Sequence, residues 1–222
     1  MWLTATNDEG SGMTSQRTRE RLVQQLAAAG IKNQQVLDVM RRVPRHLFID
    51  EALASRAYDD SALPIGHGQT ISHPLTVARM TEAVLEGHEC STILEVGTGS
   101  GFQTAVLAAL VRRVYSIERL EVLAREAALR LRSLKLRNVR LRYGDGHYGW
   151  SEFAPYDGIL VAAAASGVPR QLADQLVCGG HLVLPIDNID HQILVRVTRT
   201  SNGFKQEVLG PATFVPLVGG IG

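Results

Sequence analysis

The chain has 222 residues, a formal net charge of +1 at neutral pH and 20% charged residues. Such a balance lacks the basic excess of nucleic-acid binders, and no apolar run approaches the roughly 20 residues of a membrane span. Its two cysteines are too few for a disulfide framework and are typical of a reducing compartment. The histidines are scattered without metal-ligand spacing. We therefore expect a cytoplasmic protein without a metal, which binds neither nucleic acid nor membrane.

The N-terminal part is expected to be a leader followed by helices. Residues 1–12 are polar, lack a signal-peptide pattern and predict a disordered leader, so Met13 is a possible natural start. Apolar residues at helical spacing then predict two helices, one ending at Gly30 and one ending at Pro44. Residues 13–60 should form a helical cap, because this stretch is too short for a core of its own.

Glycine, proline and small polar residues predict a loop over residues 61–74. Pro74 suits the first turn of the next helix, which should end at Gly87. Ser72 lies just before that helix, where it can serve as an N-cap. Long loops in compact domains are often functional, so capping and active-site roles for Ser72 both remain open.

A short apolar strand over residues 92–96 leads into a glycine loop and a helix over residues 102–110. The loop has the pattern Glu-x-Gly-x-Gly-x-Gly over residues 95–101, which differs from the Gly-x-Gly-x-x-Gly dinucleotide fingerprint. Glycines allow positive φ and close approach of a ligand, and the following helix offers free N–H groups. This segment predicts a nucleotide-type cofactor site, the alternative being a plain connecting turn.

Two further acids follow predicted parallel strands. Glu118 ends the strand at residues 114–117, about 20 residues beyond the glycine loop, where a carboxylate binds ribose hydroxyls in nucleotide folds. An acid at this place also disfavours NADP. Asp145 lies between two glycines after the strand at residues 139–143. It can accept from an adenine amino group or can simply form an Asp-Gly turn.

The rest of the chain continues the α/β pattern with a long helix over residues 120–134. Pro169 should open a helix that runs through Leu176 and stops at Gly179. Four more strands are expected at residues 156–161, 181–185, 191–198 and 204–209. The prediction is an α/β, Rossmann-like fold with a mostly parallel sheet of about seven strands and helices on both faces.

Several motifs together resemble the protein-L-isoaspartate O-methyltransferases, a family of class I S-adenosylmethionine-dependent methyltransferases. The most specific is the stretch from Ala62 to Pro74, with Gly-Gln-Thr-Ile-Ser over residues 68–72. The glycine loop, Gly-Asp-Gly at residues 144–146, Pro-Tyr-Asp at 155–157 and Phe-Val-Pro-Leu at 214–217 occur in matching order. The resemblance extends from about Ser15 to Leu217.

The resemblance implies methyl transfer from S-adenosyl-L-methionine to the free α-carboxylate of L-isoaspartyl residues in damaged proteins. We expect the enzyme to be a monomer, although no sequence pattern indicates its oligomeric state. It implies that Ser72 is catalytic and that Ile71, Ser72, Val215 and Leu217 contact the substrate. The residues that should hold the cofactor are Thr70, Glu95, Gly97, Thr98, Gly99, Ser100, Gly101, Glu118, Asp145 and Gly146. Residues 13–222 would then be one domain, in which residues 61–91 form the substrate loop and helix and residues 92–222 form the cofactor-binding core.

Departures from the family pattern leave peptide preference open. Ala162 stands where a threonine is common, and Asp187 replaces a more usual glycine. Two other functions stay possible on the residues alone. One is methylation of a small molecule or nucleic acid, although no Asn/Asp-Pro-Pro-Tyr/Phe motif follows the fourth strand of the cofactor fold. The other is a non-catalytic protein that binds isoaspartyl chains or the cofactor. The glycine spacing disfavours a NAD dehydrogenase.

Overall fold

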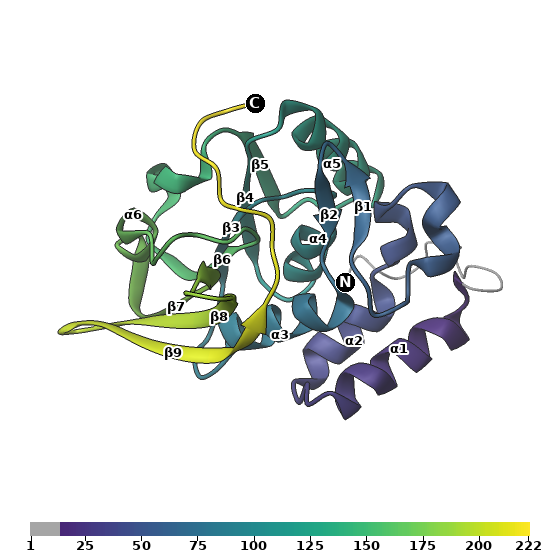
Figure 1. Cartoon of the computed structure of the whole chain (residues 1–222), viewed down its shortest axis with the longest axis horizontal. Helices are drawn as coiled ribbons and strands as arrows, with labels where there is room; N and C mark the ends of the chain where they lie inside the picture. Colours follow the sequence, from purple (N-terminus) through teal and green to yellow (C-terminus); the bar gives the residue numbers. More distant parts are fainter. Residues whose placement is uncertain (1–13) are drawn as a thin grey trace.

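The fold is built on a sheet that separates two apolar clusters. A computed structural model describes residues 14–222, so the expected leader at residues 1–12 lies outside the described residues. Within this part the chain forms a seven-stranded sheet and a separate two-stranded hairpin (Figure 1). No helix within it is long and apolar enough to cross a lipid bilayer.

The central sheet has the strand order β5-β4-β3-β6-β7-β8-β9. Its first five strands in this order are parallel, whereas β7, β8 and β9 pair antiparallel. The strands are β3 (Thr92–Val96), β4 (Arg113–Glu118), β5 (Val139–Tyr143), β6 (Tyr156–Val161), β7 (Leu176–Asp187), β8 (Gln192–Thr200) and β9 (Gly203–Ala212). Because β3 lies between β4 and β6, the order in which successive strands are added to the sheet reverses at β3. This is the place where open α/β sheets bind ligands.

Helices cover the sheet unevenly. One face carries α3 (Pro74–Leu85), α4 (Phe102–Ala108) and α5 (Glu121–Ser133), and their buried side chains share one apolar cluster. The other face carries the short α6 (Arg170–Ala173) and an aromatic group in which the Tyr115 and Phe153 rings stack at 4.4 Å. Expected helices on both faces are therefore present.

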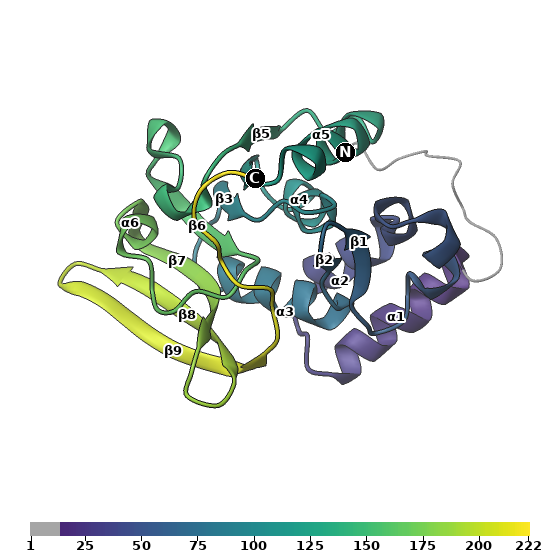
Figure 2. The same ribbon diagram turned by 45° about the horizontal axis from the view of Figure 1, so that its top comes forward.

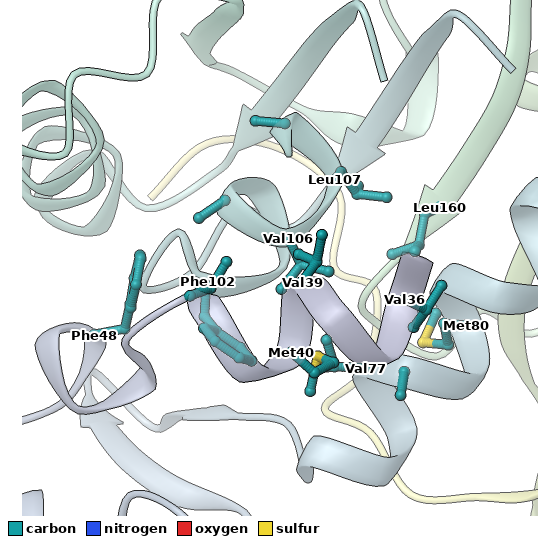
Figure 3. Packing of buried hydrophobic residues seen from close by; sticks show 14 of the residues in the cluster. Val36, Val39, Met40, Phe48, Val77, Met80, Phe102, Val106, Leu107 and Leu160 are labelled. Carbon is teal, nitrogen blue, oxygen red and sulfur yellow. The ribbon is translucent and has the colours of Figure 1, made fainter. Parts of the chain in front are cut away.

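The N-terminal helices share the core of the sheet domain. The helices α1 (Gln16–Ala28) and α2 (Gln34–Arg42) lie beside the 3₁₀ turns η2 (Arg45–Phe48) and η3 (Glu51–Arg56) (Figure 2). Figure 3 shows Val36, Val39 and Met40 of α2 in one packed cluster with residues of α3 and α4. Burial of these side chains contributes about 1.5–3 kcal/mol each, which ties α2 to the cofactor fold.

Two sequence expectations were wrong. The stretch expected as a loop contains a hairpin, β1 (Leu63–Gly66) and β2 (Gln69–Ile71), whose turn places His67 at φ 52° and Gly68 at φ 68°. The helix expected through Leu176 ends at Ala173 instead, because Leu176 already pairs with Tyr156 in the sheet.

Candidate active site

A cavity opens at the carboxyl ends of the central parallel strands, as expected for this sheet topology. It contains about 1080 Å³ of empty space, its open mouth included. Four segments form most of its wall: the end of the hairpin, the glycine loop, the end of β4 with the residues leading into α5, and the tail after β9. These are residues 68–72, 97–100, 117–120 and 215–218.

The glycine loop has the backbone that its sequence demands. Gly97, Gly99 and Gly101 all have positive φ, at 92°, 54° and 90°, which residues other than glycine rarely adopt. A Cβ on Gly97 would meet the Ala162 Cβ at 3.4 Å, so this loop packs closely on the end of β6. The loop is therefore fixed in a shape that exposes backbone to the cavity.

Glu118 lies at the cavity wall with only 5% of its surface exposed. Its two carboxylate oxygens accept hydrogen bonds from the backbone amides of Gly99, at 2.8 Å, and Leu120, at 2.9 Å. The carboxylate thereby joins the glycine loop to the start of α5. It also presents a fixed pair of acceptor oxygens to the cavity, which fits the expected contact with ribose hydroxyls.

Glu95 is buried behind the cavity and does not line it. Ile93 and Glu95 share the face of β3 toward α4, where Glu95 Oε2 accepts from Thr104 Oγ1 at 2.5 Å and Ser116 Oγ at 2.6 Å. Burial raises the pKa of Glu95 to about 7. Its other oxygen has no partner within residues 14–222. Ser116 also contacts Thr98 Oγ1 at 2.6 Å, so Glu95 reaches the loop through two hydroxyls.

Asp145, like Glu95, does not line the cavity. Its carboxylate accepts from the amides of His147, at 2.9 Å, and Gly220, at 2.6 Å. Desolvation opposes ionisation, but these amide bonds outweigh it and lower the pKa of Asp145. Gly146 does line the cavity, where a Cβ would come within 2.3 Å of Val96 Cγ1. Gly101, like Glu95 and Asp145, is not part of the cavity wall.

The end of the hairpin places residues that were predicted to contact the substrate or the cofactor on the cavity wall. Thr70, Ile71 and Ser72 all line the cavity, as do Val215 and Leu217 of the tail. A smaller cleft beside it shares Thr70, Ser72, Ala162 and Val215 with the main cavity. The N-cap of α3 is His73 without a side-chain capping bond, so Ser72 does not cap this helix. Among the described residues its hydroxyl has no hydrogen-bond partner and is available to a ligand.

Sequence reasoning missed several cavity residues. Gln69 belongs to the stretch that carried the family resemblance, and Phe102 and Gln103 directly follow the glycine loop, so position alone could have indicated them. Arg119 has a buried Nε without a partner within the described part of the chain. Nothing in its local sequence distinguishes it from the other arginines of this basic stretch.

The reversal of strand order at β3, the positive-φ glycine loop and the acid at the end of β4 define a class I S-adenosylmethionine-dependent methyltransferase. The profile of the family described as "Protein-L-isoaspartate(D-aspartate) O-methyltransferase (PCMT)" matches residues 16–222. The chain belongs to this family.

Relatives of the same name cover almost the whole chain. The protein-L-isoaspartate O-methyltransferase of Pseudomonas paraeruginosa is 58% identical over 208 residues, which are 94% of this chain and 99% of the relative. That of Halorhodospira halophila is 56% identical over 214 residues, covering 96% and 97%.

A solved structure of the same class supports the fold. The Plasmodium falciparum protein described as a putative protein-L-isoaspartate O-methyltransferase, in complex with S-adenosyl-L-homocysteine, aligns with a TM-score of 0.79 at 27% identity. The alignment covers 90% of this chain and 98% of that one. The fold expected from the sequence is thereby confirmed.

Proposed function

We propose that the chain methylates the free α-carboxylate of L-isoaspartyl residues in damaged proteins and peptides, with Ser72 orienting the acceptor. One observation carries this proposal: the Thr70–Ser72 end of the hairpin lies on the same cavity as the glycine loop and Glu118. The residues proposed to bind the isoaspartyl substrate and those proposed to bind the cofactor therefore line the same cavity.

The described residues fit S-adenosylmethionine. Glycines at 97 and 146 leave room where a Cβ would be crowded, and Glu118 supplies two buried acceptor oxygens. We assign the cofactor to the predicted set, with Glu95, Gly101 and Asp145 acting from behind the wall: Glu95 through Ser116 and Thr98, and Asp145 through the tail. When bound, the cofactor supplies a sulfonium methyl group, whose transfer gives a methyl ester and S-adenosylhomocysteine.

The chemistry assigned to Ser72 is orientation. A carboxylate acceptor is already ionised at pH 7 and needs no general base. A hydroxyl with no other partner can donate to one carboxylate oxygen and leave the second directed at the methyl group. The apolar tail residues Val215 and Leu217 line the same cavity, where apolar side chains help to exclude water from the charged acceptor.

Several accompanying features complete the proposal. Residues 13–222 form one domain, with residues 13–60 as its helical cap; the apolar cluster shared by cap and core supports this. The protein works as a cytoplasmic monomer without nucleic acid. Unpaired Cys90 and Cys178 fit a reducing compartment, and the net charge of +1 gives no basic field for nucleic acid.

Methyl transfer to two peptides that differ only in L-isoaspartate or L-aspartate at one position tests the reaction. We expect base-labile methyl ester on the isoaspartyl peptide alone. Transfer to neither peptide, with cofactor binding retained, would mean another acceptor or a non-catalytic binder.

Ser72→Ala tests the role of the serine. We expect kcat to fall at least tenfold while affinity for S-adenosylhomocysteine stays within about threefold, because the hydroxyl contacts the acceptor and not the cofactor. Ser201→Ala, in the exposed turn between β8 and β9, is the matched control and should keep full activity. Unchanged kcat in Ser72→Ala, or a covalently modified Ser72, would contradict the orienting role.

A further inference from the structure

Arg45 is a charged side chain inside the protein. Only 1% of its surface is exposed, and it is among the largest fully buried side chains. Burial lowers the pKa of Arg45 to about 10, which still leaves the guanidinium charged at neutral pH. No carboxylate in residues 14–222 forms an ion pair with it. Asp60 attracts the guanidinium only at longer range. A buried charge that forms no ion pair is costly, so its neutral contacts need an explanation.

Those contacts join the segment that follows η3 to the first residue of α4. The guanidinium donates from Nε to the carbonyl of Ala57 at 2.8 Å and from Nη2 to the carbonyl of Ser61 at 3.2 Å. Its carbon atom Cζ lies 5.0 Å from the ring centroid of Phe102, the first residue of α4 and part of the cavity wall. Arg45 thus fixes the segment of residues 57–61 against the edge of the cofactor cavity.

This segment controls both ends of the hairpin stretch at residues 62–72. One end is covalent, because β1 begins two residues after Ser61. At the other end, the carbonyl of Asp60 accepts from His73 Nδ1 at 3.1 Å, and its Oδ1 accepts from the Leu75 amide at 3.3 Å. His73 directly follows Ser72. A displacement of the segment would therefore move Ser72 relative to the glycine loop.

We propose that Arg45 is a positioning residue for methyl transfer. It holds the carbonyls of Ala57 and Ser61 so that Asp60 sets where Ser72 meets the acceptor. The inference rests on the proposed role of Ser72. It explains why a cation lies among buried apolar neighbours: an apolar residue of similar size would leave the carbonyls of Ala57 and Ser61 without this donor and the segment free to shift.

Arg45→Met tests this directly, with Arg56→Met as the matched control. Arg56 lies in the same region, but its side chain is 56% exposed. We expect Arg45→Met to lower kcat 10- to 100-fold, since ångström-scale misplacement of a reacting group has effects of about 100-fold. Affinity for S-adenosylhomocysteine and the KM for the isoaspartyl peptide should change less than about threefold. A kcat within twofold of the parent in folded Arg45→Met would overturn the proposal.

The double variant Arg45→Met/Ser72→Ala separates this inference from the proposed function. If Arg45 acts through Ser72, the double variant is no slower than Ser72→Ala alone. If the losses of kcat in the two single variants multiply in the double variant, Arg45 does not act by positioning Ser72. The proposed methylation reaction would still stand in that case. An unaffected Ser72→Ala would instead refute the orienting role on which both depend.

Asp60→Ala keeps the inference testable if Arg45→Met does not fold. The Asp60 side chain is 48% exposed, so its removal should leave the thermal midpoint nearly unchanged. It removes the Leu75 contact, and we expect the same loss of kcat in smaller degree, about three- to tenfold. Full activity of Asp60→Ala would overturn the proposed route from Arg45 to Ser72.

Discussion

Glu95→Gln provides a sharp test of the site's electrostatics. The folded pKa of Glu95, about 7, lies above its ordinary value of 4.5, so the folded chain holds this proton more tightly than the unfolded chain. The stabilisation is complete below pH 4.5 and is lost as the pH rises through 7. For a pKa rise of this size, the free energy of unfolding is about 3 kcal/mol lower at pH 8 than it would be if Glu95 remained protonated.

Glutamine keeps the shape and can still accept from the hydroxyls of Thr104 and Ser116, but it cannot ionise. We therefore expect the free energy of unfolding of Glu95→Gln, relative to the parent, to increase by about 2–3 kcal/mol between pH 5 and pH 8. Urea unfolding at several pH values, without cofactor, measures this difference. Contributions from other titrating groups cancel, because both proteins contain them.

Glu51→Gln is the matched control, because Glu51 is exposed in the first turn of η3. As a substitution at an exposed side chain, it should change the free energy of unfolding by no more than about 0.5 kcal/mol. A flat difference for Glu95→Gln between pH 5 and pH 8 would refute the reasoning, because it would mean that Glu95 ionises in the folded chain as easily as in water.

Two further substitutions test packing. Gly146→Ala should destabilise the fold by about 1–3 kcal/mol and weaken cofactor binding, because its Cβ would come within 2.3 Å of Val96 Cγ1. Calorimetric titration with S-adenosylhomocysteine measures the loss of binding. Gly167→Ala is the control, because a Cβ at this position meets no atom within 4 Å. Phe48→Ala should cost about 3–5 kcal/mol in urea unfolding because the ring is fully buried, whereas the exposed Val122→Ala should stay within about 0.5 kcal/mol. A Phe48→Ala loss no larger than that control would contradict the packing.

The prediction of Glu118 shows what sequence spacing can achieve. Parallel strands that follow one another bring their carboxyl ends to one edge of a sheet, so an acid about 20 residues beyond a glycine loop returns to that loop. The structure has Glu118 Oε2 on the Gly99 amide. The order and direction of the strands are therefore enough to predict that Glu118 lies next to the glycine loop.

Other features depend on contacts that no local pattern records. The hairpin strands have only 4 and 3 residues and contain Pro64 and Gly66, which are signs of a loop. Leu172 and Leu176 have helical spacing, yet Leu176 pairs with Tyr156 across the sheet, and tertiary pairing overrides the weak local preference. For Glu95, the sequence predicts the strand but not that α4 covers the face on which Glu95 lies.

The tail after β9 separates folding from activity. Residues 215–218 form one wall of the cavity, although they follow every strand of the sheet in the sequence. A variant shortened to end after Ala212 would keep all seven strands of the sheet and the helices α3 to α5, but it would lose this wall. Its cavity would then be open to water on this side, so such a variant should fold without being active.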